Sequence, residues 1–403
     1  MLEAYIYDGL RTPFGRHAGA LAPVRPDDLL AHTVHAVVER NAFEPAAFED
    51  VIAGCTNQAG EDARNVARHA GLLAGLPIET AGMTVNRLCG SGLAAIVAAA
   101  RAVTCGEGEL FMTGGVESMS RAPFVLGKAE SAYSRNARMF DSTIGPRFPN
   151  PKIVERFTTA SGNMPETAEN VAQEYAIARD AADRFALASQ ERYQNAKKQG
   201  FYDGELLAVD VPTGRKTPPA TVAEDEHPRA DTSAQKLARL RPLYPDGVVT
   251  AGNASGVNDG ACALIVGSRA AGDKAGARPR ARIVAAAVAG VEPRLMGLGP
   301  VPSSQKVLER AGLGLADMDV IELNEAFASQ VLGCLKLLNI DPQDERLNPN
   351  GGAIAIGHPL GASGARLTLT ALRQLERIQG RYALVTMCIG VGQGIAAVIE
   401  RMA

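Results

Sequence analysis

The chain opens with short apolar runs that alternate with helical stretches over its first 120 residues. Apolar runs of strand length occur at 4–7, 50–55, 82–86 and 109–114, and helical patterns occur at 28–40, at 65–74 and after position 89. Strands separated by helices are typical of βαβ units, in which strands pair in parallel and helices cover both faces of the sheet. The pattern therefore predicts an α/β fold with a mostly parallel sheet.

The pattern changes between Glu117 and about position 250. This region is rich in proline, arginine and asparagine, and it contains one amphipathic helix pair near 167–199. Because a segment of this length is too long for a plain loop in a compact domain, we expect an inserted subdomain. Strand-like alternation resumes at 261–266 and again at 280–291.

The end of the chain repeats a pattern found near its beginning. A glycine- and serine-containing turn at 361–364 precedes an apolar helix and a strand at 382–387, in the order and at nearly the spacing of the turn at 90–92, its helix and the strand near 109–113. Such self-similarity indicates an internal duplication whose two halves bring their loop ends together at one site. We expect a first half at 1–120 plus 250–278, an inserted domain at 121–249 and a second half at 279–403.

The composition is that of an ordinary globular protein, with 46% hydrophobic and 21% charged residues among 403. A formal net charge of −3 gives no electrostatic reason to expect nucleic acid or an anionic membrane as a partner. The N-terminal stretch lacks the order of a secretory signal, and apolar runs such as 283–289 are much shorter than a membrane span. We therefore expect a cytoplasmic protein.

Six cysteines are spread along the chain without a CxxC pair, and His358 is the only histidine near a suggestive motif. This distribution is typical of neither a zinc site nor a disulfide framework. We expect no metal and no structural disulfides.

One cysteine lies in a distinctive turn, in the stretch NRLCGSGLAAIVAAA at 86–100. Gly90 and Gly92 permit a sharp turn, Ser91 is suited to cap a helix, and the alanine-rich run that follows favours a helix buried on all sides. The thiol of Cys89 would then lie beside a helix N-terminus, where the macrodipole lowers a thiol pKa. A single cysteine is more often a small buried hydrophobe, and the turn alone leaves both interpretations open.

Three turn-rich stretches in the second half also carry reactive groups. They contain Asn324 in NEAF, His358 in IGHPLGASG and Cys388 in MCIGVGQG, each just past a predicted strand or before a predicted helix. Ligand sites of open α/β sheets lie at such ends. A lone histidine is more often structural, but a second cysteine in a glycine-rich turn favours a catalytic site over coincidence.

Several longer motifs together resemble the thiolase family, the acetyl-CoA C-acyltransferases. They are NRLCGSGL at 86–93, GGVESMSRAP at 114–123, AGNASGVNDGA at 251–261, NEAF at 324–327, NPNGGAIAIGHPLGASGAR at 348–366 and MCIGVGQG at 387–394. The resemblance covers essentially the whole chain. It implies a five-layered α-β-α-β-α fold built from two duplicated halves with an inserted loop domain, a homodimer or homotetramer, and coenzyme A as a substrate with no permanently bound cofactor.

The resemblance also implies roles for the motif residues. Cys89 would be the acylated nucleophile, His358 its activating base and an oxyanion donor, and Cys388 a second acid/base. Asn324 would hold a water in one oxyanion hole, and the amides of Cys89 and Gly390 would form the other. A thiol nucleophile suits cleavage of a 3-oxoacyl-CoA, because its acyl product keeps the energy of a thioester. A second thiol exchanges the proton of the departing acetyl group, and two oxyanions require two sets of donors.

The same resemblance assigns residues to coenzyme A and to the acyl chain. Met164, Ala251 and Ser255 would line the pantetheine channel with Phe327 near it, and Arg229 would lie near the nucleotide phosphates. The run DSTIGPRFPNP at 141–151 resembles a loop of 3-oxoadipyl-CoA thiolases of aromatic catabolism, although Pro146 replaces their usual aromatic residue. Arg147 in this loop would pair with a carboxylate at the end of the acyl chain. The alternative is an ordinary arginine that pairs with Asp141 or Glu155, or that bridges subunits.

We therefore expect reversible thiolytic cleavage of a 3-oxoacyl-CoA, with 3-oxoadipyl-CoA giving succinyl-CoA and acetyl-CoA. An acetoacetyl-CoA thiolase, a fatty-acid 3-ketoacyl-CoA thiolase and a non-catalytic acyl-CoA carrier are the alternatives. The run Asn163-Met164-Pro165-Glu166 stands where acetoacetyl-CoA enzymes often have His-Met-Gly, which argues against that specialisation. A nicotinamide dehydrogenase would need GxGxxG after the first strand and a serine hydrolase GxSxG, and the sequence has neither at the required place.

Overall fold

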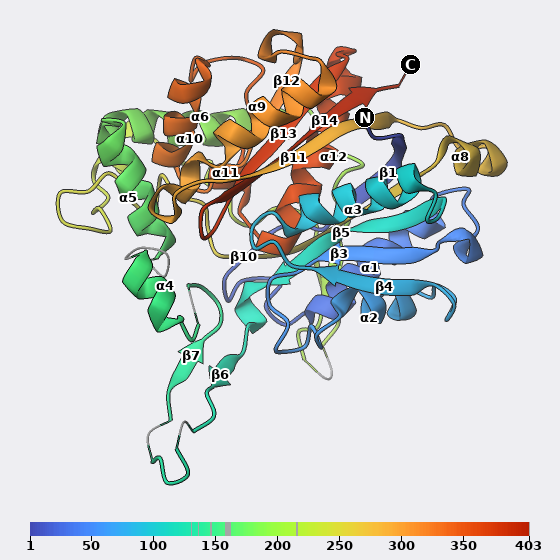
Figure 1. The fold of residues 1–403 in the computed structure, drawn as a ribbon, viewed down its shortest axis with the longest axis horizontal. Helices are drawn as coiled ribbons and strands as arrows, with labels where there is room; N and C mark the ends of the chain where they lie inside the picture. The colour runs from blue at the N-terminus through green and yellow to red at the C-terminus, as the bar shows by residue number, and fades with distance from the viewer. Residues whose placement is uncertain (130, 136, 146, 158–162, 215–216, 403) are drawn as a thin grey trace.

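Ten strands of the described residues form one continuous twisted sheet. The computed structural model describes residues 1–129, 131–135, 137–145, 147–157, 163–214 and 217–402 (Figure 1). The strands are β1 (Ala4–Arg11), β2 (Gly15–Arg16), β3 (Asp50–Gly54), β4 (Ala81–Val85), β5 (Leu110–Ser118), β10 (Asn258–Gly267), β11 (Ala281–Gly290), β12 (Val320–Leu323), β13 (Tyr382–Ile389) and β14 (Gln393–Arg401). Their order is β12-β13-β14-β11-β1-β10-β5-β3-β4, with β2 beside β10.

The sheet consists of two halves with the same pairing pattern. In the first half β3 pairs in parallel with β5, which pairs antiparallel with β10, which pairs antiparallel with β1. In the second half β12, β13, β14 and β11 repeat this succession, and a short antiparallel contact between β1 and β11 joins the halves. The expected internal duplication is therefore confirmed.

The expectation of a mostly parallel sheet is wrong. Among the described strands only β3–β4, β3–β5 and β12–β13 pair in parallel. The connection between β13 and β14 is a tight turn at 390–392, and a turn of that length joins antiparallel strands, whereas a parallel pair needs a crossover of about a dozen residues or more. The apolar runs in the sequence do not show whether strands pair in parallel or antiparallel. A strand buried on both faces is a continuous apolar run in either case.

Helices complete a five-layered architecture. Helices α3 (Ser91–Cys105) and α12 (Leu360–Ile378) pack against each other and against strands of both halves, which places them in the middle layer. On the outer faces, α1 (Pro26–Glu39) and α2 (Val66–Leu73) cover the first half, and α9 (Pro300–Ala311), with α10 (Ala328–Leu338) beside it, covers the second (Figure 1). The remaining helices are α4 (Pro151–Arg156), α5 (Met164–Glu174), α6 (Arg179–Lys198), α7 (Ala234–Ala238), α8 (Arg269–Ala275) and α11 (Ala353–Ile356), and 3₁₀ turns occupy Pro45–Ala47, Met119–Arg121, Pro293–Leu298 and Leu315–Asp317.

The middle layer explains why α3 is almost wholly apolar. By length and composition the stretch Leu88–Cys105 resembles a membrane span, but in this fold it is mostly buried, as expected from its sequence. The two middle helices approach closely at their N-terminal ends. A Cβ atom on Gly92 would lie 2.5 Å from the carbonyl oxygen of Gly361, and one on Gly364 would lie 2.3 Å from the backbone nitrogen of Leu93. Only glycine fits this contact, which brings together the turns that precede both helices.

The region expected as an inserted domain projects from the sheet. Its hairpin of β6 (Phe124–Leu126) and β7 (Met139–Asp141), together with α4, extends away from the body, whereas α5 and α6 lie beside α10 (Figure 1). A second small sheet pairs β8 (Val209–Val211) with β9 (Ala220–Val222). The expected domain boundaries at 120, 249 and 278 stay a prediction.

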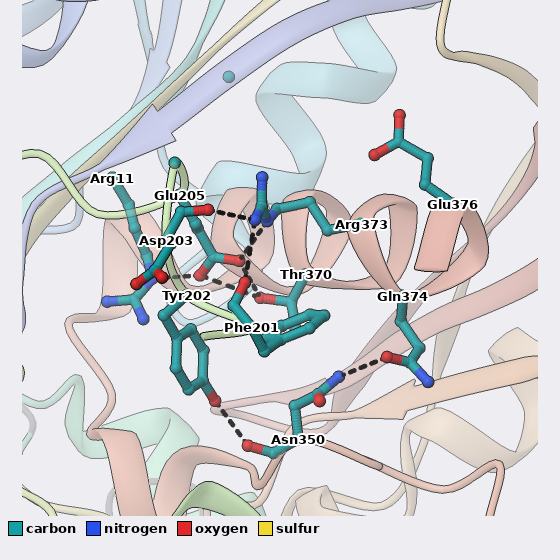
Figure 2. Close-up of polar contacts among 12 residues, drawn as sticks. Arg11, Phe201, Tyr202, Asp203, Glu205, Asn350, Thr370, Arg373, Gln374 and Glu376 are labelled. Carbon is teal, nitrogen blue, oxygen red and sulfur yellow. Dashed lines mark hydrogen bonds and ion pairs between the residues drawn. The ribbon is translucent and has the colours of Figure 1, made fainter. Parts of the chain in front are cut away.

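Buried ion pairs connect the segment after α6, which contains Tyr202 and Glu205, to the middle layer (Figure 2). Glu205 is fully buried and forms ion pairs with Arg11 of β1 at 2.5 Å and with Arg373 of α12 at 3.6 Å. Nearby, the hydroxyl of Tyr202 donates a hydrogen bond of 2.5 Å to the carbonyl oxygen of Asn350. Breaking a buried ion pair on one side is strongly destabilising, so these contacts hold α12 in place.

Candidate active site

The turn that carries Cys89 connects β4 to α3, but its geometry differs from the expected one. Leu88 rather than a glycine adopts a left-handed conformation, with φ of 47°, and Gly90 has an ordinary φ of −84°. The hydroxyl of Ser91 accepts a hydrogen bond from the backbone N–H of Arg87 at 2.9 Å and donates to the carbonyl of Leu88 at 2.6 Å. Ser91 therefore stabilises the turn from inside and does not cap the helix as predicted.

Close packing explains the glycine that follows the cysteine. A Cβ atom on Gly90 would lie 2.7 Å from Cδ1 of Ile389, the last residue of β13. The backbone N–H of Gly390, the next residue, is directed at the Cys89 thiol as a hydrogen-bond donor. The structure thus brings the Cys89 turn and the β13–β14 turn together, as the duplication predicts.

The Cys89 thiol is protonated at neutral pH. Its residue is partly exposed, yet burial of the sulfur raises the pKa to about 11, against the opposing effect of the amides of Gly390 and of Cys89 itself. The expected lowering of this pKa by the helix N-terminus is therefore wrong, because desolvation of the thiolate outweighs the amide dipoles. A nucleophilic role requires a base that accepts the proton.

His358 is buried and carries a basic nitrogen. Its Nδ1 lies 2.6 Å from the hydroxyl of Ser363, whose single proton is donated to the carbonyl of Pro359 at 2.8 Å. The hydroxyl must therefore accept from Nδ1–H, which leaves a lone pair on Nε2. Burial, together with the charge of Arg366, lowers the pKa of His358 to about 3, so the imidazole is neutral. The backbone N–H of His358 is fixed by Oδ1 of Asn258 at 2.9 Å.

Asn324 lies beside this basic nitrogen. Its Nδ2 is 3.4 Å from Nε2 of His358, and its backbone N–H donates to the carbonyl of Thr386 at 3.0 Å. Its Oδ1 is buried and accepts no hydrogen bond from the described residues. Because a buried carbonyl oxygen without a donor is unfavourable, this atom is suited to receive one from a water or a substrate.

Cys388, near the end of β13, places a second thiol near the first. It is 1% exposed, and burial, followed by the neighbouring Cys89 and Cys334, raises the pKa of its thiol well above the ordinary range. The two neutral thiols therefore lie together with the amides of Cys89 and Gly390, and the neutral imidazole of His358 lies beside Asn324. Such a set can exchange protons and stabilise an oxyanion without a resident charge.

Most of the residues expected along the pantetheine channel lie near Cys388. Met164 and Phe327 belong to the same hydrophobic cluster as Cys388, and Ser255 is tied to it by a hydrogen bond of 2.9 Å from its backbone N–H to the carbonyl of Ala326. Ala251 is exposed in the turn that precedes Ser255.

Arg229 is not part of that cluster. Its backbone N–H donates to Oε1 of Gln190 at 2.9 Å, and it lines a surface hollow of about 460 Å³ together with Lys198. Its role in binding coenzyme A stays a prediction.

The loop that holds Arg147 is docked against the first half. The guanidinium donates to the carbonyl of Ser142, whose hydroxyl accepts from Nδ2 of Asn57 at 3.4 Å. Within the described residues no ion pair within 4.0 Å joins Arg147 to Asp141 or Glu155, although its charge contributes to lowering the pKa of Asp141, and its buried Nε has no hydrogen-bond partner there. Pro146 lies outside the described residues. The ion pairs of the alternative interpretation are thus not formed, and the guanidinium has spare donors.

Two further buried polar residues, Glu117 and Asn258, support the site although no motif pattern marks them as functional. Glu117 is 2% exposed on β5 and accepts hydrogen bonds from three backbone N–H groups, and Asn258 fixes the backbone of His358. The sequence feature that could have marked Glu117 is an acidic residue within an apolar strand. Buried carboxylates without partners are rare, so such a residue is expected to have a specific role.

Comparisons with known proteins agree with this geometry. Family models for the thiolase N-terminal domain and the thiolase C-terminal domain match residues 4–270 and 277–401. A 3-oxoadipyl-CoA/3-oxo-5,6-dehydrosuberyl-CoA thiolase of Escherichia coli (strain K12) is 58% identical over 404 residues, covering 100% of both chains.

Solved structures have the same fold over the same length. An acetyl-CoA acetyltransferase of Bacillus anthracis superposes with a TM-score of 0.92 at 36% identity, covering 100% of this chain and 99% of the other. Human mitochondrial 3-ketoacyl-CoA thiolase in complex with CoA gives a TM-score of 0.90 at 39% identity, covering 100% and 98%. The chain therefore belongs to the thiolase family and is an enzyme of the acyltransferase class.

Proposed function

We propose that this enzyme cleaves 3-oxoadipyl-CoA with coenzyme A to give succinyl-CoA and acetyl-CoA, in a reversible reaction. The observation that carries the proposal is the full-length likeness to the Escherichia coli enzyme, whose name states this substrate. The site supports it with two thiols, an imidazole whose Nε2 carries a lone pair beside the amide of Asn324, and a guanidinium whose buried Nε has no partner among the described residues.

The first half-reaction forms an acyl-enzyme on Cys89. Nε2 of His358 takes the thiol proton as the sulfur attacks the 3-oxo carbon, and the amides of Cys89 and Gly390 bind the tetrahedral oxyanion. The bond between C2 and C3 then breaks. The electron pair passes into the thioester enolate of acetyl-CoA, whose oxygen receives hydrogen bonds from the imidazolium and from a water on Asn324. Cys388 donates its proton to C2, which completes acetyl-CoA.

The second half-reaction restores both thiols. The Cys388 thiolate accepts the proton of an incoming coenzyme A thiol, whose sulfur attacks the Cys89 thioester. Succinyl-CoA forms, and the departing Cys89 thiolate takes back the proton from His358. After these two proton transfers Cys89, His358 and Cys388 are all neutral again. Burial stabilises the neutral form of each of the three groups. Burying a thiolate or an imidazolium alone is unfavourable. The attraction between the two charges offsets this desolvation cost only when both form together.

Arg147 would bind the terminal carboxylate of the adipyl chain. The loop that holds it contacts Asn57 through Ser142, and Asn57 follows the strand β3 near the Cys89 turn. A carboxylate removed from water needs a charged partner, and a guanidinium can pair with it bidentately.

Coenzyme A is expected to pass along Met164, Ala251, Ser255 and Phe327 with its phosphates near Arg229. A structure of a family member with bound CoA supports coenzyme A as the ligand. No permanently bound cofactor or metal is part of the proposal, and a homodimeric or homotetrameric cytoplasmic enzyme stays our expectation.

A comparison of substrates tests the proposed function. Thiolytic kcat/KM should be at least about tenfold higher for 3-oxoadipyl-CoA than for acetoacetyl-CoA or a neutral 3-oxoacyl-CoA of similar length, because only the former pairs with the guanidinium. A preference for acetoacetyl-CoA or for long neutral chains would assign the chain to one of the alternative thiolases. Binding of acyl-CoA without turnover would make it a carrier.

A further inference from the structure

Glu117 connects the two catalytic turns although it belongs to neither. Its side chain extends from β5, buried between the turn after β3 and the start of α12. Oε2 accepts hydrogen bonds of 3.0 Å from the backbone N–H groups of Thr56 and Gly361, and Oε1 accepts one of 3.1 Å from Asn57. One carboxylate thus satisfies donors from two segments that are about 300 residues apart in the chain.

On the histidine side, the carboxylate acts as the cap of α12. The N-cap residue of this helix is Pro359, which follows His358 directly and offers no capping side chain. Gly361 is the second helical residue, and its N–H would lack an acceptor without Glu117. A negative charge is favourable at a helix N-terminus, although burial of Glu117 raises its pKa to about 7 against the opposing effect of the amides of Thr56 and Asn57. The fit is tight, because a Cβ atom on Gly361 would lie 2.2 Å from the carbonyl oxygen of Val116.

On the nucleophile side, the same carboxylate fixes the segment on which the Cys89 turn rests. Thr56 accepts a hydrogen bond of 3.2 Å through its carbonyl from Nδ2 of Asn86, the first residue of the turn. Cys55, which precedes Thr56, donates its backbone N–H to the carbonyl of Val85 at 3.2 Å. The link therefore continues by hydrogen bonds into the Cys89 turn, and on the other side along the chain, since Gly361 lies three residues after His358.

We propose that Glu117 is a positioning residue for the thiolase reaction, whose carboxylate holds the turn of His358 in register with the turn of Cys89. The inference rests on the proposed function of these two residues. Glu117 itself touches no reacting atom. It acts by fixing the relative position of base and nucleophile, which belong to different halves of the fold and whose misplacement by about 1 Å typically slows catalysis about 100-fold.

Replacement by glutamine tests the link with little change in shape. An amide can accept at only one of its two ends, so Glu117→Gln leaves at least one of the three backbone N–H groups facing another donor and removes the charge. We expect kcat for thiolysis to fall roughly 10- to 100-fold while KM for coenzyme A stays within about twofold. The rate at which acetyl-CoA acylates Cys89 should fall by a similar factor.

The control is Glu376→Gln on α12, the helix whose N-terminus Glu117 contacts. Glu376 lies two residues before the end of α12 and pairs with Arg280 at 2.7 Å, so this variant also replaces a glutamate by glutamine and loses an ion pair. It should lower the melting temperature without changing kcat. If Glu117 matters only for stability, Glu117→Gln will behave like Glu376→Gln and retain kcat within about twofold, which would overturn the proposal.

Two further measurements keep the outcome decisive. Should Glu117→Gln fail to fold, Glu117→Asp keeps the charge but is one methylene too short to reach all three donors, and it should lose roughly tenfold in kcat. Wild-type kcat in a folded Glu117→Asp enzyme would contradict the proposal. Acylation of Cys89 by acetyl-CoA tests positioning whichever acyl chain the enzyme prefers. Rejection of 3-oxoadipyl-CoA by the wild-type enzyme would therefore contradict the proposed substrate alone.

Discussion

Nδ1 of His358 donates a hydrogen bond of 2.6 Å to the hydroxyl of Ser363, one turn into the helix that the histidine precedes. This contact fixes the tautomer that leaves Nε2 free to accept a proton. Ser363→Ala should therefore lower kcat about tenfold, the equivalent of one hydrogen bond, with little change in KM for coenzyme A.

The control for this variant is Thr368→Val on the same helix. The hydroxyl of Thr368 donates to the carbonyl of Gly364 at 2.9 Å, as that of Ser363 does to Pro359, but it does not contact the histidine. Steady-state kinetics of both variants separate the two roles. Equal losses of kcat would show that the hydroxyl matters to the helix and not to the imidazole.

The two thiols are expected to fail in different half-reactions. Cys388→Ala should still accept an acetyl group from acetyl-CoA on Cys89, because that step needs only the nucleophile, the imidazole and the amides. Overall thiolysis of a 3-oxoacyl-CoA should fall by at least about 10²–10⁴-fold, since no group remains to protonate C2. Stopped-flow turnover and peptide mass spectrometry measure the two steps. A folded Cys388→Ala enzyme that cannot be acylated would contradict this division of roles.

Arg147→Ala tests recognition of the substrate carboxylate. It should lower kcat/KM for 3-oxoadipyl-CoA roughly 10- to 100-fold, as expected for loss of a charged hydrogen bond of about 1.5–3 kcal/mol. Cleavage of acetoacetyl-CoA should stay within about twofold, because that substrate has no terminal carboxylate. Arg156→Ala, which removes an exposed arginine from α4 of the same region, should affect neither substrate. Equal losses on both substrates in Arg147→Ala would assign the residue to structure.

Local pattern predicted most elements of this fold but not how strands pair. The strands around Ile52 and Leu384 and the helix that follows Cys89 lie where their apolar periodicity places them. The direction of pairing is decided by connections, and the tight turn at Gly392 joins its two strands as an antiparallel hairpin that the expected parallel sheet did not include. The duplication was visible, because both halves repeat a glycine-containing helix start.

The candidate site was predictable where motifs carry chemistry and not where tertiary packing decides. The turn of Cys89 and the β13–β14 turn meet as expected, since each follows a strand end of one half, although Cys388 itself lies within β13. The sign of the Cys89 pKa shift could not be predicted, because the helix N-terminus favours a thiolate while burial from distant segments opposes it more strongly. The hydroxyl of Ser91 and the carboxylate of Glu117 find partners through the folded turn, which no local pattern reveals.

Under the proposed mechanism Cys89 carries the acyl group in thiolysis of 3-oxoadipyl-CoA. In a decisive experiment, wild-type enzyme is mixed with this substrate in the absence of free coenzyme A and quenched in acid. Peptide mass spectrometry then identifies the acylated residue. We expect release of acetyl-CoA and a succinyl thioester on the peptide that contains Cys89, and added coenzyme A should remove this succinyl group within one turnover time. A succinyl group on another residue, or release of acetyl-CoA with no acylated peptide, would contradict it.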